Sequence, residues 1–464
     1  MIEAKTIKEL KKQAYKPQTI KQEIRTNLVE NLKNGVNSFT GIVGFEDSVI
    51  PQLENAILAG QDVILLGERG QAKTRILRSL TNLLDEKIPY ISSCEIHCDP
   101  VDPICTECKI LVKEEGESVE IAWLDQESRF SEKLATPDVS VGDLVGEIDP
   151  IKIAEGRHLS DERAIHYGMI PRSHRGIFCI NELPDLSERI QVSLFNLLQE
   201  RDIQIKGYQF RLPLDIFLVA TANPEDYTNR GRIITPLKDR YGAQIRTHYP
   251  DTVLQEIAIV DQERKRFEDL DAVVLIPDFV KKLLVTFTHL ARQSPEVNQR
   301  SGVSLRVSIA NYETLMAQTY KRAIKQSTKA SPRISDMDCI ISSTMGKLEL
   351  ETVEEGKEAD IIRSLMQRAI QNIFAESVDR ESLEPLITSM NDGLVISTGP
   401  ELPDADYMKA IESVPGLRPI LERLVDSSED TILASGLEFI LEGLHLNRLV
   451  NKSSDGQVDQ YLQG

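Results

Sequence analysis

The sequence of 464 residues has no apolar run approaching the roughly 18 residues of a membrane-spanning helix, and its charged N-terminus lacks the apolar core of a signal peptide. It also has no long block of Lys or Arg, and 73 acidic residues against 54 basic ones give a net charge of −19. Such a surface repels DNA and anionic lipid. We therefore expect a cytoplasmic protein that inserts into no membrane and binds no DNA directly, and that acts on protein partners or small ligands.

Cysteine is scarce, and the few cysteines are unevenly placed. Six cysteines in a reducing compartment argue against a disulfide framework. Four of them (Cys94, Cys98, Cys105 and Cys108) gather in fifteen residues, in an insertion expected at about 90–115. Four thiolates suit structural zinc, yet of the spacings of three, six and two residues only the last is a standard knuckle. Zinc, an iron–sulfur cluster and metal-free thiols remain alternatives, and the two other cysteines are expected to be packing residues.

Short apolar runs bounded by polar residues or Gly predict buried strands at 63–66, 177–180 and 216–220. Amphipathic helical patterns lie between these runs, and such alternation predicts a parallel α/β sheet. From residue 251 onward the strand pattern fades and amphipathic helices follow one another. The last segment, 452–464, is polar and is expected to fray.

The segment Gly67-Glu-Arg-Gly-Gln-Ala-Lys-Thr74 follows the first strand directly and precedes a predicted helix. This is the strand–loop–helix setting of a P-loop, in which backbone N–H groups and the helix N-terminus hold the phosphates of ATP. Lys73 would reach the β- and γ-phosphates, and the Thr74 hydroxyl would bind Mg²⁺. Ala72 replaces the usual Gly, and its backbone can approach the phosphates if its φ is negative. We expect nucleotide contacts from Gly67, Gly70, Gln71, Ala72, Lys73, Thr74 and Arg75.

The strand near 177–180 ends in Asn181-Glu182, where a P-loop protein needs acid groups for the metal and the attacking water. Glu182 would orient or deprotonate the water. Asn181 occupies the position that normally carries Asp. Its amide oxygen can still accept a hydrogen bond from a metal-bound water, but it brings no negative charge. We expect weaker metal binding and slower turnover as a result.

Two further polar residues extend this site. Asn223 ends the third strand, where it can position the water beside the γ-phosphate. Arg240 follows in the stretch 235–241 and could be donated to the γ-phosphate of a neighbouring subunit, a contribution worth roughly a thousandfold or more in rate. Arg232 is the rival for this role, and a surface salt bridge with Asp239 is the alternative for Arg240.

Taken together, these residues resemble the AAA+ superfamily, and more narrowly the branch that holds the magnesium chelatase ATPase subunit and the MoxR-type ATPases. The Ala-Lys-Thr form of the P-loop is typical of that branch. Three other segments carry the resemblance. They are the adenine-wrapping stretch 39–44 with Ile42 and Val43, a helix-2 insertion at about 135–170, and a lid helix at 304–310 whose Arg306 would act as sensor 2.

The resemblance covers about residues 37–325 and implies a five-stranded parallel sheet with helices on both faces, followed by an α-helical lid. Beyond it, the sequence itself predicts an extra α-helical C-terminal region. The expected regions are a helical arm at 1–36, the nucleotide-binding domain at 37–250, the lid at 251–345 and an acidic helical region at 346–464. The resemblance also implies a hexameric ring with ATP between subunits, and Arg306 reaching the γ-phosphate. A partner with a von Willebrand factor A-type domain would be a separate chain, because this sequence has no Asp-x-Ser-x-Ser motif.

The leading hypothesis is therefore an ATP-hydrolysing motor that remodels or activates a partner protein, in metal insertion or cofactor maturation. The alternative is a nucleotide-gated binding or scaffold module with little hydrolysis, which Asn181 favours. A sigma-54-type transcription activator shares the same core, but the Gly-Ala-Phe-Thr-Gly-Ala loop of those proteins is absent and Phe39-Thr40-Gly41 lies too early in the chain to replace it.

Overall fold

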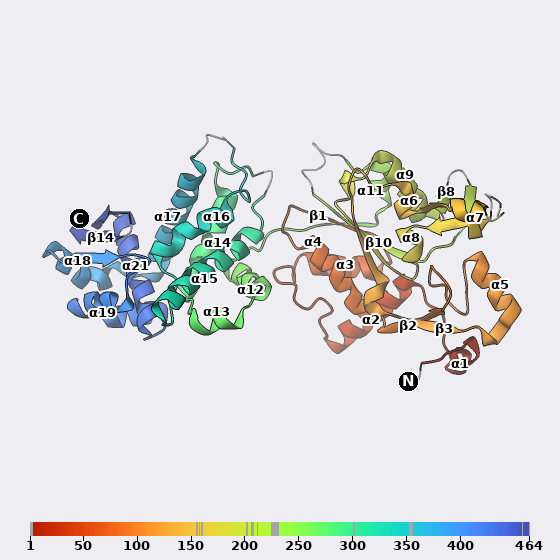
Figure 1. Cartoon of the computed structure of the whole chain (residues 1–464), viewed down its shortest axis with the longest axis horizontal. Helices are drawn as coiled ribbons and strands as arrows, with labels where there is room; N and C mark the ends of the chain where they lie inside the picture. Colours follow the sequence, from red (N-terminus) through yellow and green to blue (C-terminus); the bar gives the residue numbers. More distant parts are fainter. Residues whose placement is uncertain are drawn as a thin grey trace. The chain divides into compact units, whose positions relative to one another are not determined.

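The computed structural model describes residues 3–154, 156, 158, 161–200, 203–205, 208–210, 212–223, 232–299, 302–351, 356–456 and 458–463. The chain divides into two compact units, Met1–His248 and Tyr249–Gly464. Figure 1 shows both units, with labels on many of their elements.

The centre of the first unit is a five-stranded parallel sheet, which confirms the predicted fold class. In spatial order its strands are β11 (Ala243–Arg246), β1 (Val63–Leu66), β10 (Ile216–Ala222), β7 (Gly176–Asn181) and β4 (Phe130–Leu134). The three strands predicted from the sequence are β1, β7 and β10, the inner strands of this sheet, and β10 is buried along its whole length. Continuous apolar runs revealed them because both faces of the sheet are covered.

Alternate side chains of these strands enter two different hydrophobic clusters. Val63 and Leu65 pack with α2 (Ile20–Asn34), α3 (Val49–Leu58) and α4 (Lys73–Ser79). Ile64, between them, packs in the other cluster, which includes α9 (Glu188–Glu200). The period of two along a strand therefore gives the sheet one apolar layer on each face.

The remaining elements of the first unit surround this sheet. An antiparallel pair of β2 (Lys87–Ile91) and β3 (Ile121–Asp125) carries α5 (Thr106–Glu115) between its strands. A second pair, β5 (Gly146–Ile148) and β6 (Ile165–Tyr167), lies within the insertion expected at about 135–170. The others are α6 (Val141–Leu144), α7 (Pro150–Ala154), α8 (Met169–Arg172), α11 (Thr235–Arg240) and the hairpin of β8 (Ile203–Ile205) and β9 (Tyr208–Phe210).

The segment expected as an N-terminal arm is helical and packs within the first unit. It forms α1 (Ile7–Lys12) and α2, and α2 ends at Gly35, whose φ of 66° is left-handed. Glu23 of α2 is buried and forms a two-point ion pair with Arg129, with both N–O distances at 2.6 Å. Arg129 also donates to the backbone oxygen of Arg175, at 3.0 and 2.8 Å. The arm is thereby held to the segment that leads into β4.

The second unit is mainly helical, and one hydrophobic cluster from Val260 to Tyr461 spans both the expected lid and the C-terminal region. The boundary expected at 345/346 therefore lies inside this unit. Its helices are α12 (Val253–Glu263), α13 (Glu268–Val273), α14 (Asp278–Gln293), α15 (Arg306–Gln326), α16 (Ile340–Thr344), α17 (Glu358–Ser377), α18 (Glu384–Asn391), α19 (Asp404–Ser413), α20 (Leu417–Val425) and α21 (Asp430–Leu446).

The expectation that the C-terminal tail frays is wrong. β13 (Val450–Ser454) and β14 (Asp459–Gln463) pair antiparallel, and β12 (Ile396–Thr398) completes a three-stranded sheet. Tyr461 is only 2% exposed and anchors β14 in the core. The sequence did not reveal β13 because only Val450 among its five residues is apolar, so it has no hydrophobic alternation.

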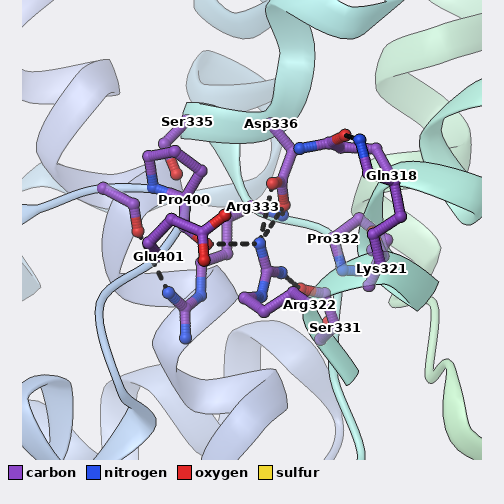
Figure 2. Close-up of polar contacts among 12 residues, drawn as sticks. Gln318, Lys321, Arg322, Ser331, Pro332, Arg333, Ser335, Asp336, Pro400 and Glu401 are labelled. Atoms are coloured by element: carbon purple, nitrogen blue, oxygen red, sulfur yellow. Dashed lines mark hydrogen bonds and ion pairs between the residues drawn. The ribbon is translucent and has the colours of Figure 1, made fainter. Parts of the chain in front are cut away.

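Two buried arginines, Arg322 and Arg333, join the lid segment to the C-terminal region (Figure 2). Arg322 of α15 donates to both carboxylate oxygens of Asp336 at 2.7 Å and to the backbone oxygen of Pro400 at 3.2 Å. Arg333 donates to the backbone oxygens of Gly399 and Leu402, at 3.1 and 2.8 Å. These contacts fix the loop before α19 against the end of the lid helix.

No helix among the described residues is both long and apolar enough to cross a membrane.

The Glu23–Arg129 pair gives the first testable prediction. Replacing Glu23 with Ala leaves the Arg129 charge buried without its carboxylate, so we expect the free energy of unfolding to fall by about 3–5 kcal/mol. Chemical denaturation of the full chain measures this change. Lys11→Ala is the matched control, because the Lys11–Glu117 pair is 53% and 54% exposed and should contribute less than about 1 kcal/mol. Equal losses in the two variants would contradict the prediction.

Candidate functional site

The loop between β1 and α4 is held against the neighbouring strands by hydrogen bonds. The Gly67 N–H donates to the backbone oxygen of Ala222 at 3.1 Å. A Cβ at Gly67 would lie 1.9 Å from the Thr247 hydroxyl and 2.3 Å from Gln71 Oε1, so only glycine fits there. Gln71 is buried, and its Oε1 accepts from the Glu68 N–H at 3.0 Å and from the Thr247 hydroxyl at 2.8 Å. The Gln71 side chain therefore braces the loop from within the protein.

Ala72 has a φ of 53°. Its backbone was expected to approach the phosphates only if this φ were negative, so that condition is not met. The left-handed conformation costs a residue with a Cβ roughly 1–2 kcal/mol. The Ala72 carbonyl accepts from the Ile76 N–H at 2.9 Å, the first hydrogen bond of α4, and its side chain packs against the cluster of Ile76 and Leu77. Gly70, with a φ of 76°, is the other left-handed residue of the loop.

Lys73 and Thr74 begin α4 at the mouth of the loop. Lys73 is 7% exposed, and its ammonium group donates to the backbone oxygens of Gly67 and Glu68, the latter at 2.7 Å. The Thr74 hydroxyl donates to Asn181 Oδ1 at 3.0 Å. The first turn of α4 is thus joined directly to the end of β7, while the next side chain, Arg75, is exposed.

Asn181 and Glu182 lie at the carboxyl edge of the sheet. The Thr221 hydroxyl accepts from the Glu182 N–H at 3.0 Å and lies 3.4 Å from Asn181 Oδ1. Glu182 has a left-handed φ of 56°, which turns the chain sharply after β7. Burial raises the pKa of Cys179 to about 12, so its thiol keeps a proton. This thiol donates to Asn181 Oδ1 at 3.7 Å. Asn223, 1% exposed, follows β10 at this same edge.

Two residues of this arrangement were not predicted from the sequence. The Thr221 hydroxyl, near the end of β10, accepts a hydrogen bond from the Glu182 N–H after β7. The Thr247 hydroxyl, just after β11, donates to Gln71 of the P-loop. Both are threonines at the ends of short strands. Their only sequence signal is that position, which many threonines share, so pattern reasoning could not select them.

Ile42 lies in the same hydrophobic cluster as Ile76 of α4, and Val43 is half-buried beside it. Arg240 lies on α11, and its guanidinium carbon is 4.2 Å from the ring centre of Phe195 on α9. Its side chain is 31% exposed, and Arg232 is exposed as well. The donation of either arginine to a neighbouring subunit stays a prediction.

Arg306 is exposed and is the first residue of α15 in the second unit. A buried carboxylate holds this end of the helix: Ser308 donates to Glu256 at 2.5 Å, and Arg292 and His289 reach the same carboxylate at 2.7 and 3.0 Å. Burial alone would raise the pKa of Glu256, but hydrogen bonds with His289 and Arg292 outweigh it and hold the pKa below its usual range. The contact of Arg306 with a phosphate stays a prediction.

The four clustered cysteines lie in the other hydrophobic cluster of the first unit, away from the P-loop cluster. All four are buried, and their sulfur atoms lie within 4.8 Å of one another. They form a second candidate site that shares no residue with the P-loop edge.

Comparisons with known proteins agree with this architecture. The family model of the Sigma-54 interaction domain matches residues 156–237, a minority of the chain that includes β7, β10 and the first residues of α11. A magnesium-chelatase subunit ChlI from Nostoc is 28% identical over 237 residues, covering 50% of this chain and 59% of its own length. A ChlI homolog from Methanocaldococcus jannaschii is 28% identical over 243 residues, covering 50% of this chain and 60% of its own. The chain thus spans about three fifths of these relatives.

Solved structures give weaker likenesses. A model of the complex between the BchI and BchD subunits of magnesium chelatase is 20% identical, with a TM-score of 0.37, over 70% of this chain and 98% of that one. A closed-state Hsp104 reaches a TM-score of 0.39 at 10% identity, over 70% of this chain and 52% of that one. Because neither score reaches 0.5, the assignment rests on the strand order and the sequence relatives.

The strand order, the P-loop between β1 and α4, and Asn181-Glu182 at the end of β7 agree with the AAA+ fold that the sequence motifs predict. Within that class, the chain is similar to the magnesium-chelatase ChlI subunits, which confirms the resemblance predicted from its motifs. The similarity to MoxR-type ATPases stays a prediction.

The backbone of Ala72 gives the second prediction. Ala72→Gly removes the cost of a left-handed Cβ, so we expect the full chain to gain about 0.5–1 kcal/mol of stability in thermal or chemical unfolding. Ala59→Gly is the control, because Ala59 ends α3 with a φ of −82°. The same exchange there should destabilise by about 0.5–1 kcal/mol. A loss of stability in both variants would contradict the assigned conformation of Ala72.

Proposed function

We propose that this chain binds and hydrolyses ATP and uses the reaction to remodel or activate a partner protein. The observation that carries the proposal is the junction of three strands at one edge of the sheet. There the Thr74 hydroxyl of the P-loop helix donates to Asn181 at 3.0 Å, and Thr221 joins Glu182 to β10 at 3.0 Å. Phosphate-binding and water-activating groups thus meet where ligands of open parallel α/β sheets bind.

The P-loop supplies the phosphate site. Backbone N–H groups of the loop after Glu68 and the start of α4 favour negative charge, and Lys73 adds a buried ammonium group at the mouth. In the reaction, a water oxygen forms a bond to the γ-phosphorus while the bond from that phosphorus to the β–γ bridging oxygen breaks. ADP and phosphate are the products, and the Glu182 carboxylate accepts the proton of the water. Asn223 would orient that water through its amide group.

The donor set also fits Mg²⁺, because Thr74 and Asn181 present a hydroxyl and an amide oxygen 3.0 Å apart, and Mg²⁺ takes oxygen ligands. When bound, the ion supplies positive charge that neutralises the phosphate oxygens. Asn181 Oδ1 would hold a metal-bound water as an acceptor. The ligand set has one negative charge fewer than it would with Asp, so metal binding is weaker.

We further propose a homo-oligomeric ring, a hexamer, in which Arg240 of one subunit reaches the nucleotide of the next. This is supported by the half-exposed position of Arg240 on α11 and by the likeness to chelatase subunits. Arg306 would contribute from the lid. The remodelled partner would carry a von Willebrand factor A-type domain, and the work done would be metal insertion or cofactor maturation in the cytoplasm.

A second candidate function has an observation of its own. The Asn181 amide oxygen accepts a hydrogen bond from the Thr74 hydroxyl at 3.0 Å, so a neutral amide occupies the position where an acidic residue is usual. With that charge missing, ATP could serve to hold a complex together while turning over very slowly. The motor and this nucleotide-gated scaffold differ in rate and share the same binding site.

Mixing two inactive variants tests both the proton acceptor and the shared site. Glu182→Gln removes the base and should lower phosphate release about 100-fold or more while ATP binding is kept. Arg240→Ala should lower phosphate release by a similar or larger factor. Because each variant carries the group that the other lacks, an equimolar mixture should regain part of the activity. Steady-state phosphate release measures all three samples.

Glu188→Gln is the control, because Glu188 is exposed at the start of α9 and should leave turnover unchanged. Full turnover in Glu182→Gln would exclude that residue as the base. Loss of activity in Arg240→Ala without recovery in the mixture would place the arginine in the site of its own subunit.

Asn181→Asp separates the motor from the scaffold. The substitution restores a negative charge beside the Thr74 hydroxyl, so we expect the Mg²⁺ concentration for half-maximal turnover to fall about tenfold and phosphate release to rise. Titration of Mg²⁺ at saturating ATP measures both quantities. If the wild type already releases phosphate rapidly and the variant changes neither quantity, the scaffold function is excluded.

A further inference from the structure

The cysteine cluster has the dimensions of a site for one metal ion. The sulfur atoms of Cys94, Cys98, Cys105 and Cys108 all lie within 4.8 Å of one another, and Cys94 and Cys105 are 3.9 Å apart. Four sulfurs arranged as a tetrahedron at about 2.3 Å from zinc lie about 3.8 Å from each other. The Cys94–Cys105 sulfur separation of 3.9 Å matches that edge, and the other sulfur pairs lie within about 1 Å of it or closer.

The same separations disfavour the two alternatives. A disulfide needs sulfurs about 2.0 Å apart, and all four cysteines are free thiols. An iron–sulfur cluster places several iron and sulfide atoms between its cysteines, so their sulfurs lie further apart than around a single ion. The arrangement therefore fits one ion bound directly by four sulfurs.

Backbone N–H groups already point at these sulfurs. The Cys98 N–H donates to Cys94 Sγ at 3.3 Å. The Cys105 N–H donates to Cys98 Sγ, and the Cys108 N–H donates to Cys105 Sγ, both at 3.4 Å. Such hydrogen bonds stabilise negative charge on sulfur, which a thiolate ligand carries. The cysteines are 0–9% exposed, so an ion at their centre would be shielded from water.

The loop that carries the cysteines is fixed from distant parts of the chain. Asp99, next to Cys98, accepts the Tyr15 hydroxyl at 2.6 Å and pairs with Arg175 at 3.0 Å. Arg175 also donates to the backbone oxygen of Pro89 at 2.6 Å. These contacts position the loop independently of any metal, which preorganises the four sulfurs.

A second set of contacts links the cluster to the insertion that holds β5 and β6. Glu162 accepts the N–H and the hydroxyl of Thr106, at 3.0 and 2.5 Å, and the Tyr167 hydroxyl at 3.1 Å. Thr106 directly follows Cys105. A cavity of about 180 Å³ beside the cluster, lined by Lys152, Glu162 and three of the cysteines, gives the ion a path of entry.

We propose that Cys94, Cys98, Cys105 and Cys108 bind one structural Zn²⁺ that holds α5 against the β5–β6 insertion through Thr106 and Glu162. The ion displaces the thiol protons to solvent and changes no oxidation state. Its role is independent of ATP: it fixes the insertion on one face of the sheet, whereas the P-loop packs with the cluster on the other face.

Metal content tests the proposal. Untagged wild-type protein, purified without chelator from zinc-supplemented cells, should contain about one zinc per chain by elemental analysis. The double variant Cys105→Ser/Cys108→Ser should contain almost none. Cys339→Ser is the control, because Cys339 lies outside the cluster in the second unit and its loss should leave zinc content unchanged.

A measurement on the wild type covers the case in which the double variant does not fold. Protein from cobalt-supplemented cells should show intense visible bands of tetrahedral Co²⁺ and a near-ultraviolet thiolate-to-cobalt band. Removing the metal should speed hydrogen exchange at 94–115 and 146–154 while ATP affinity is kept. Metal far below one per chain, iron with acid-labile sulfide, or a Cys94–Cys105 disulfide in the isolated protein would overturn the proposal.

Discussion

Strand β10 holds the candidate site together, because it lies between the P-loop strand and the acid strand. Its register pairs Leu66 with Ala222 and Ile180 with Ala220, so all three strands end at the same edge. The register of β10 cannot change without disrupting the site. A shift of one residue in β10 would turn its side chains to the opposite face of the sheet and separate Thr221 from Glu182. The positions of the loop, Asn181 and Asn223 all follow from that register.

The inner strands and the P-loop could be predicted because their physical cause is local. A strand buried on both faces must be apolar throughout, and Val63–Leu66 shows this directly in the sequence. The conformation of Ala72 could not be predicted, since its left-handed φ is held by the start of α4 and by packing. The bracing of the loop by Gln71 and Thr247 joins residues 176 positions apart, and no local pattern encodes such a contact.

The same limit explains the two ends of the chain. The N-terminal segment 1–36 is predicted as a helical arm, yet Glu23 within it is 5% exposed because Arg129 pairs with it. The C-terminal strands have little alternation, yet Tyr461 lies in the core and its hydroxyl contacts Glu442 at 2.5 Å. In both cases the partner of a polar or isolated apolar residue lies far away in sequence, so composition alone indicates an exposed segment. Buried polar pairs are therefore the features that sequence patterns miss most readily in this fold.

The two candidate sites of the first unit pack in different hydrophobic clusters, one on each face of the sheet. Ile64 faces the cluster of the cysteines, whereas its neighbours Val63 and Leu65 face the cluster of the P-loop helix. A change at the cysteines can therefore reach the nucleotide edge by moving whole strands or by moving the β5–β6 insertion, and a tightly packed sheet resists the first of these. The insertion is joined to Thr106 by Glu162, in a partly buried contact. A metal at the cysteines would thus determine where the insertion is presented to a partner, while the P-loop helix α4 packs in the opposite layer.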